Sequence, residues 1–232
     1  STPQMLLVDM DACTRCGACV DVCPTNVINL TAQDETSTRQ VHAVILASGV
    51  KLYNLREFED AKSWAVSKDV VSSLAFERII SGTGTFDGTI KRPSDGKIAK
   101  RLAWVQCMGS RNRRQNRDYC SSICCMFALK EAVLAMEKGG DDVETTIFYM
   151  DMRTFGKDFY RYYEHAVDIG VKFVRCRVQA VMLNPDKSLA MRHFDSGTEE
   201  FIEADYDMVV LATGQIPYDT HKGLADLLHI KV

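Results

Sequence analysis

Long hydrophobic runs are missing from this sequence of 232 residues. Apolar stretches such as those at 44–47 and 208–212 are far shorter than the roughly 18 residues that a membrane-spanning helix needs. No secretory signal is visible, and there is no basic excess, since 28 Lys and Arg face 31 Asp and Glu. A membrane span and nucleic-acid binding are therefore not expected. The 46% hydrophobic and 25% charged residues are typical of a soluble globular chain.

The dinucleotide fingerprint G-x-G-x-x-G is also missing from the place where it would be expected. A strand predicted at 101–106 leads through a loop to a helix, but the turn after it reads QCMGSR and keeps only Gly109. The glycine-rich segment 81–88 has the wrong spacing and follows a helix predicted at 73–80, so we interpret it as a turn. A nicotinamide pyrophosphate pocket is therefore predicted to be lost.

Cysteine is the residue that stands out against these absences. Eight of the nine cysteines are bunched in two groups, whereas disulfide frameworks distribute cysteines along the chain. Bunching favours metal binding and a reducing compartment, which we expect to be the cytoplasm. The N-terminal cysteine set is Cys13, Cys16, Cys19 and Cys23; the second cysteine set is Cys107, Cys120, Cys124 and Cys125; Cys176 stands alone.

The N-terminal cysteine set has the spacing C-x2-C-x2-C-x3-C-P, which is that of bacterial ferredoxins. Gly17 supplies backbone freedom to a loop that wraps a [4Fe-4S] cluster, and Pro24 redirects the chain after it. Zinc is the main alternative, but zinc sites usually use two separated cysteine pairs. In two-cluster ferredoxins the fourth cysteine binds the other cluster, so Cys23 is predicted to reach a second cluster whose remaining ligands lie upstream of this sequence.

The second cysteine set combines a cysteine at a strand end with three at a helix start. Cys107 follows the strand 101–106, and C-x3-C-C opens a helix that Gly139 and Gly140 terminate. Cys120 and Cys124 would share a helix face, so all four cysteines can converge only if Cys125 reaches from near the helix start or the first turn is irregular. The second cysteine set therefore either binds an iron-sulfur cluster or is a group of buried structural cysteines.

Arginines fill the loop between the two halves of the second cysteine set. One interpretation is that these arginines belong to an ordinary solvated loop. The other is that they provide a positive environment, which stabilises an anionic cluster and raises its reduction potential. The sequence is compatible with both interpretations. These arginines are Arg111, Arg113, Arg114 and Arg117.

The remaining pattern predicts an α/β fold with a Rossmann-like unit. Two apolar strands, 41–49 and 206–214, end in small-residue turns that would contact a cofactor at the carboxyl edge of a sheet. Asp151 follows a strand at the position where dinucleotide enzymes bind ribose, so it is a candidate remnant of such a site. Cys176 is predicted to face the core. Further elements are strands at 145–152 and 171–184, a helix at 159–170, and a hairpin of 188–195 with 199–205 turning at Ser196 and Gly197.

Together these patterns indicate a two-domain flavoprotein fragment with a small α+β ferredoxin-type segment at its N-terminus. The predicted division is a partial ferredoxin segment at 1–40, parts of an FAD-binding domain at 41–100 and 206–232, and an NAD-domain-like unit with the second metal site at 101–205. The turn residues expected near the cofactor are Ala47, Ser48 and Gly49, and Ala212, Thr213 and Gly214.

Several stretches in combination resemble the flavin-carrying A-type subunits of heterodisulfide reductases over nearly the whole chain. They are CTRCGACVDVCP, VILASG, SSLAFERIISGTG, KRPSDGKIAKRLAWVQCMGSR, YCSSICCMFALKEA, TTIFYMDMRTFGK, GVKFVRCRV and DMVVLATG. Members of this family resemble thioredoxin reductases with an inserted ferredoxin unit, which implies a Rossmann-like fold of the pyridine nucleotide-disulfide oxidoreductase type. The resemblance implies that the second cysteine set binds a [4Fe-4S] cluster beside FAD in the full-length protein, and that Lys130 lies near the reactive flavin nitrogen and pairs with Glu77. It also implies that the chain is an internal segment.

The resemblance implies an oxidoreductase subunit that passes electrons between FAD and [4Fe-4S] clusters, with flavin-based bifurcation as one form of this chemistry. Expected partners are other heterodisulfide reductase-type subunits and a ferredoxin, hydrogenase or dehydrogenase electron donor, and a dimer is compatible with the family. One alternative is an NAD(P)H-dependent thiol-disulfide flavoreductase, but the stretch 71–79 holds no cysteine for it. A zinc-stapled binding module is a weaker alternative.

Overall fold

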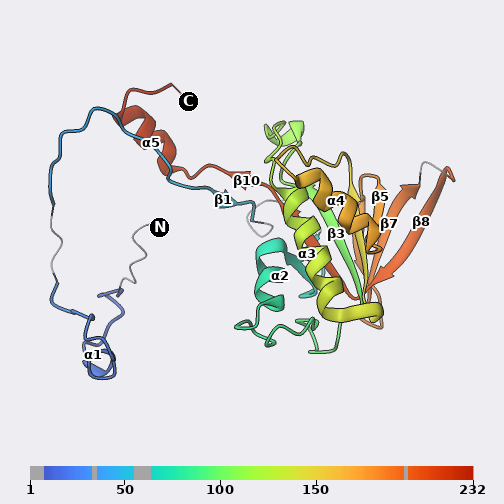
Figure 1. Cartoon of the computed structure of the whole chain (residues 1–232), viewed down its shortest axis with the longest axis horizontal. Helices are drawn as coiled ribbons and strands as arrows, with labels where there is room; N and C mark the ends of the chain where they lie inside the picture. The colour runs from blue at the N-terminus through green and yellow to red at the C-terminus, as the bar shows by residue number, and fades with distance from the viewer. Residues whose placement is uncertain (1–7, 33–35, 55–63, 196–197, 232) are drawn as a thin grey trace. The chain divides into compact units, whose positions relative to one another are not determined.

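The computed structural model describes residues 8–32, 36–54, 64–195 and 198–231 (Figure 1). Two compact units make up the chain, Ser1–Ala47 and Ser48–Val232. None of the helices in the described ranges has the length and apolar character needed to cross a membrane.

The first unit contains a short helix and extended loops. Helix α1 spans Ala18–Asp21 and begins after Gly17, whose φ of 79° lies in the left-handed region. The strand predicted at 41–49 is wrong, because residues 43–50 form neither helix nor strand. Val44 is 60% exposed and Ile45 is 91% exposed. An apolar sequence becomes a strand only where a neighbouring strand supplies hydrogen-bond partners, and no described strand lies beside this one.

A five-stranded parallel sheet forms the centre of the second unit. Its strand order is β2-β9-β3-β4-β5, and every neighbouring pair is parallel. Every residue of β9 is buried, as expected for a parallel sheet that is covered on both faces. The predicted α/β class is therefore confirmed. The strands are β2 Val70–Ser72, β3 Arg101–Met108, β4 Glu144–Tyr149, β5 Lys172–Arg175 and β9 Met208–Thr213.

Helices cover one face of this sheet, and a second sheet covers the other. Trp104 of β3 points toward the helices, where it packs with Phe76 and Leu129. Ala103 and Val105 point the opposite way, toward Leu189 and Met191 of the second sheet. β3 is therefore buried from both sides. The helices that contribute to the first core are α2 Ser73–Ile80, α3 Cys124–Gly139 and α4 Phe159–Asp168.

The second sheet is antiparallel and has the order β6-β7-β8. The predicted hairpin is confirmed as β7 with β8, while its turn at Ser196 and Gly197 lies outside the described residues. The predicted strand 171–184 divides into β5 and β6, which belong to different sheets. The strands are β6 Ala180–Leu183, β7 Leu189–Asp195 and β8 Glu200–Tyr206. The remaining elements are α5 Thr220–Leu227 and the two-residue strands β1 Lys51–Leu52 and β10 Gln215–Ile216.

The predicted domain boundaries do not follow the central sheet. The sequence assigns 41–100 and 206–232 to one domain and 101–205 to another, yet β2 and β9 share a sheet with β3. Residues 48–232 form one compact unit. Hydrophobic periodicity locates strands along the chain but does not say which distant strand lies beside which, and the domain boundaries at 100/101 and 205/206 remain predictions.

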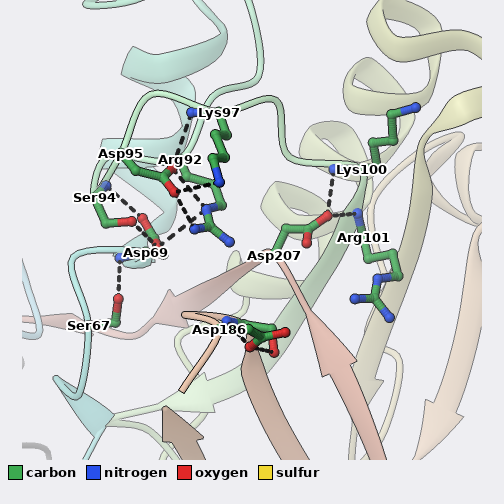
Figure 2. Close-up of polar contacts among 11 residues, drawn as sticks. Ser67, Asp69, Arg92, Ser94, Asp95, Lys97, Lys100, Arg101, Asp186 and Asp207 are labelled. Atoms are coloured by element: carbon green, nitrogen blue, oxygen red, sulfur yellow. Dashed lines mark hydrogen bonds and ion pairs between the residues drawn. The ribbon is translucent and has the colours of Figure 1, made fainter. Parts of the chain in front are cut away.

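Buried charges fix the amino edge of the central sheet (Figure 2). Asp69, fully buried just before β2, accepts hydrogen bonds from Ser94 N at 2.8 Å and Ser94 Oγ at 2.6 Å. Arg92 lies 3.8 Å from the same carboxylate and also pairs with Asp95. Asp207, just before β9, accepts the backbone N–H groups of Lys100 and Arg101 at 2.8 Å each. The loop before β3 is thereby held at the edge opposite Cys107.

Replacing Asp69 by alanine should lower the free energy of unfolding by about 3 kcal/mol, because it removes two hydrogen bonds and half of a buried ion pair. The matched control is Asp142→Ala, which breaks the exposed pair with Lys100 at 3.0 Å and should cost less than about 1 kcal/mol. Urea denaturation of the two variants measures the difference. Equal losses would show that the buried network contributes no more than a surface pair.

A carboxyl group is buried within the core between β3 and α3. Trp104 Nε1 donates a hydrogen bond to Glu131 Oε2 at 2.7 Å, and both side chains are fully buried. Burial raises the pKa of Glu131 to about 8, although the Trp104 hydrogen bond acts in the opposite direction. Glu131 is therefore a neutral acid at pH 7 and below.

The raised pKa of Glu131 makes stability depend on pH. The folded state holds this proton up to about pH 8, whereas the unfolded chain releases it near 4.5, so the contribution is full below about pH 4.5 and is lost as pH rises toward 8. Glu131→Gln keeps an acceptor for Trp104 and carries no charge. We expect the wild type to lose about 1 to 3 kcal/mol relative to this variant between pH 5 and pH 8.5. Urea denaturation at each pH measures this difference. If the free energy of unfolding changed equally with pH in both proteins, the assignment of the raised pKa to Glu131 would be contradicted.

Candidate metal centre

The end of β3 is distorted where Cys107 lies. The register between β3 and β9 shifts between Val105 and Met108, and Cys107 has a φ of 65°. Gly109 follows with a φ of 78°, and a Cβ on it would lie 2.2 Å from Cγ of Tyr53. Three further non-glycine residues between Cys107 and α3 also have positive φ angles: Arg111, Asn116 and Ser122. Strain of this kind is concentrated at functional sites.

Cys120 lies before α3 and not within it. The helix begins at Cys124, and Ser122 has a φ of 58°, so the chain turns between these two cysteines. Ser122 N donates to Cys120 Sγ at 3.3 Å. The prediction that Cys120 and Cys124 share a helix face is therefore wrong, because a left-handed residue interrupts the helical geometry. An irregular start of this kind is the condition under which four cysteines can converge.

The structure brings the thiols of the second cysteine set together. Burial raises the pKa of Cys124 to about 12, and the nearby thiols of Cys107, Cys125 and Cys120 raise it further in that order. Burial is also the main cause that raises the pKa of Cys107 and of Cys125. Thiols whose pKa is raised in this way become thiolates at neutral pH only when a cation is bound to them.

Positive and hydrogen-bonding groups surround these sulfurs. Arg153 N donates to Cys125 Sγ at 3.4 Å, and Arg111 acts to lower the pKa of both Cys107 and Cys125. Cys124 Sγ donates to the carbonyl of Thr213 at 3.6 Å, and Cys125 Sγ to that of Asp151 at 3.8 Å. The Arg153 N–H and the Arg111 guanidinium therefore suit a thiolate-bound group of negative overall charge.

The turn after β9 lies against this centre. A Cβ on Gly214 would lie 2.1 Å from Ser110 Oγ and 2.9 Å from Ser121 Oγ, so only glycine allows the approach. Thr213 and Ala212 are buried beside it. The sequence predicts residues 212–214 as cofactor contacts, and the structure places them next to the second cysteine set.

Within the described ranges, no three His, Cys, Asp or Glu side chains are placed to hold a single metal ion. Four sulfurs around one zinc would each lie about 2.3 Å from it. In a [4Fe-4S] cluster each cysteine binds a different iron, so its sulfurs are more widely spaced. The absence of such a group therefore concerns sites for one metal ion, and a [4Fe-4S] cluster at the second cysteine set remains a prediction.

The N-terminal cysteine set is wrapped around α1. Cys13 and Cys23 are half-buried, whereas Cys16 and Cys19 are exposed. The Thr25 hydroxyl, 3.6 Å from Cys23 Sγ, and backbone N–H groups lower the pKa of that thiol to about 7. The backbone N–H of Ala18 lowers the pKa of Cys16. A loop whose amides point at its sulfurs favours the thiolate form that iron binds.

The residues expected near a flavin are only partly assembled. Lys130 Nζ lies 2.8 Å from Glu77 Oε1, which confirms their pairing, and both line a cavity of about 840 Å³. Ser48 Oγ lies 2.9 Å from His221 Nε2, while Ala47 and Gly49 are exposed loop residues. β1 and β10 pair antiparallel, so the segments after Gly49 and Gly214 lie side by side. Flavin contact by these residues remains a prediction.

Sequence reasoning missed two buried polar residues close to the site. Glu131 lies on the apolar stripe of α3 three residues after Ala128, and a charged residue at such a position was the available signal. Gln106 adjoins Cys107 on β3 and is 7% exposed. Asp151, considered a remnant ribose ligand, instead accepts ion pairs from Arg111 at 2.8 Å and Arg175 at 3.6 Å. Cys176 is half-buried and packs against the second core, as predicted.

Known proteins are similar to this chain in a local motif and along most of its length. Residues 6–29 match the family model of the 4Fe-4S binding domain and include all of the N-terminal cysteine set. A thioredoxin reductase from T. acidophilum aligns with a TM-score of 0.40 at 14% identity, over 74% of this chain and 43% of that one.

Curated relatives align along nearly the whole sequence. The A subunit of the "H(2):CoB-CoM heterodisulfide,ferredoxin reductase" of Methanothermobacter marburgensis is 36% identical over 218 residues, covering 94% of this chain and 33% of the relative. The iron-sulfur A subunit of the "CoB--CoM heterodisulfide reductase" of Methanocaldococcus jannaschii is 36% identical over 234 residues, covering 100% and 35%. The chain spans about one third of the length of these relatives.

Proposed function

Because the chain is homologous to about one third of the A-type subunits of heterodisulfide reductases, we propose that it is an electron-transferring part of an oxidoreductase subunit of this type. In this proposal each cysteine set contributes to [4Fe-4S] binding. The observation that carries it is the convergence of the second cysteine set at the carboxyl edge of the parallel sheet, in a buried region with Arg111 and the N–H of Arg153 beside it.

The residues that would hold the second cluster are Cys107, Cys120, Cys124 and Cys125. Such a cluster, when bound, supplies one-electron redox chemistry at a potential that its surroundings set. The burial of Cys124 and Cys125 limits water access, and the Arg153 N–H donates to a cysteine sulfur. The Arg111 guanidinium adds positive charge. These groups stabilise the more negative, reduced state and so favour a higher potential.

The flavin would lie beside the Lys130 and Glu77 pair. Lys130 is held by Glu77 at 2.8 Å, and that contact raises the pKa of the ammonium, which keeps a positive charge at the wall of the 840 Å³ cavity. FAD supplies two-electron chemistry when it is bound in the full-length protein. The role of this chain's residues would be to hold a cation at the flavin, with β2 and α2 forming the wall.

Partners and location follow from the same proposal. The name of the Methanothermobacter marburgensis relative links that protein to a heterodisulfide, to ferredoxin and to H2. For this chain we infer a cytoplasmic complex with further subunits of the heterodisulfide reductase type and a ferredoxin, hydrogenase or dehydrogenase donor. Flavin-based bifurcation would be one mode of this activity.

Replacing Cys124 by serine should remove the iron of one four-iron cluster, because the variant lacks a buried ligand of the second cysteine set. Cys176→Ser is the matched control, since Cys176 is half-buried, lies outside both sets and should leave the iron content unchanged. Anaerobic iron and sulfide quantitation of both variants checks this. Unchanged iron in Cys124→Ser would remove this residue from the ligands, and zinc without iron in the wild type would contradict the electron-transfer proposal.

The Cys124→Ser variant also isolates the N-terminal cysteine set. We expect less than one complete cluster to remain, because Cys23 is predicted to bind a second cluster and no other C-x2-C-x2-C-x3-C run occurs in this sequence. Cys19→Ser introduced into this variant should release the remaining iron. A complete four-iron cluster that persists in Cys124→Ser and is lost with Cys19 would contradict the shared role of Cys23.

A further inference from the structure

Five arginines line a cavity that electron transfer between the cysteine sets and a flavin does not use. Its volume is about 750 Å³, within the range of small-molecule sites. No cysteine occurs among the described residues that line it, so it is distinct from the space between the thiols of the second set. Asp118 also lines it, so the arginines outnumber the acidic groups of the described lining. The arginines are Arg111, Arg113, Arg114, Arg153 and Arg177.

These arginines come from three neighbouring strands. Arg111, Arg113 and Arg114 follow β3, Arg153 follows β4, and Arg177 follows β5. β3, β4 and β5 are adjacent and parallel, so their carboxyl ends meet at one edge of the sheet. Ligands of open α/β sheets bind outside this edge. The cavity therefore occupies the position of a ligand site, although the glycine fingerprint of dinucleotide binding is missing.

The positive charge of the cavity is only partly neutralised. Asp151 lies 2.8 Å from Arg111 and 3.9 Å from Arg153. Arg113, Arg114 and Arg177, all exposed, form no ion pair with any carboxylate in the described part of the chain. Guanidinium groups match phosphate oxygens in a two-bond geometry, so three of them at one concave surface favour a phosphate-bearing ligand.

A buried amide lies at the inner side of this cavity. Gln106 is 7% exposed, and neither its Nε2 nor its Oε1 has a hydrogen-bond partner among the described residues. It lines a smaller cavity of about 110 Å³, to which Cys107 and Cys176 also contribute. This cavity shares Asn112 and Arg177 with the arginine cavity, so the two adjoin. An unpaired buried amide is costly, and its donor and acceptor side by side match the edge of an adenine or a carboxamide.

We propose that the two adjoining cavities bind a nucleoside phosphate. The phosphates lie against Arg113, Arg114 and Arg177, and the base extends toward the amide of Gln106. The concave shape and the buried amide favour a small ligand over the acidic surface of a protein, which would reach the exposed guanidinium groups but not Gln106.

Calorimetric titration of the complete chain with ADP and with inorganic pyrophosphate at physiological salt tests this proposal. We expect ADP to bind more tightly than pyrophosphate. Arg177→Gln should weaken both by about tenfold or more, because a charge-assisted hydrogen bond is lost. Gln106→Leu should weaken ADP by about tenfold and leave pyrophosphate unchanged, and the unchanged pyrophosphate affinity shows that this variant is folded.

Arg161→Gln, which removes the same charge from an exposed position on α4, is the matched control and should change neither affinity. If Arg161→Gln weakens binding as much as Arg177→Gln does, the probes are attracted by surface positive charge in general and the proposed site is refuted. Absence of binding of both probes to the wild type also refutes it. Equal affinities of ADP and pyrophosphate, unaltered by Gln106→Leu, would overturn the nucleoside part. Each of these measurements reads an affinity and not an iron content, so failure of this proposal is distinguishable from failure of the proposed electron transfer.

Discussion

Gathering four thiols in one place, two of them buried and two half-buried, is the constraint on which the rest of this structure depends. Each sulfur removed from water is harder to ionise, and each neighbouring sulfur adds repulsion, as the pKa of about 12 for Cys124 shows. Such a group is useful only with a cation bound to it. The positive φ of Cys107, the interrupted helix start at Ser122 and the glycine at 214 all allow the sulfurs to approach one another. The local strain is thus located where the sulfurs converge.

In the central sheet, groups that stabilise the fold lie at the amino edge of the strands, and the candidate functional groups lie at the carboxyl edge. At the amino edge, Asp69 and Asp207 satisfy backbone and side-chain donors and hold the loop before β3. At the carboxyl edge, β3, β4, β5 and β9 end in the residues that surround the thiols or line the arginine cavity. Because parallel strands place all their carboxyl ends together, one sheet can assemble a site from segments that are distant along the chain.

Helix α3 connects three parts of the molecule. Its first residues are Cys124 and Cys125, Lys130 pairs with Glu77 of α2, and Glu131 accepts the Trp104 hydrogen bond within the core. Lys130 and Glu131 are adjacent yet lie in opposite environments, one at a cavity wall and one fully buried. The neutral Glu131 therefore anchors the helix without adding a second negative charge beside Glu77.

Local pattern in the sequence is sufficient for the N-terminal cysteine spacing, for α2 at its observed bounds, for strands β3, β4 and β9, and for the hairpin of β7 with β8, because these depend on residues close along the chain. It is not sufficient for the strand predicted at 41–49, since strand formation needs a neighbour that periodicity does not name. Nor does it show that β9 inserts between β2 and β3, or that Cys120 precedes the helix; pairing over long distances and the left-handed Ser122 decide those features. Cysteine spacing alone thus indicates which residues carry the sulfur chemistry. That four thiols, an arginine cavity and the buried Gln106 meet at one edge depends on the folded sheet, because the strands that form this edge are far apart in the chain.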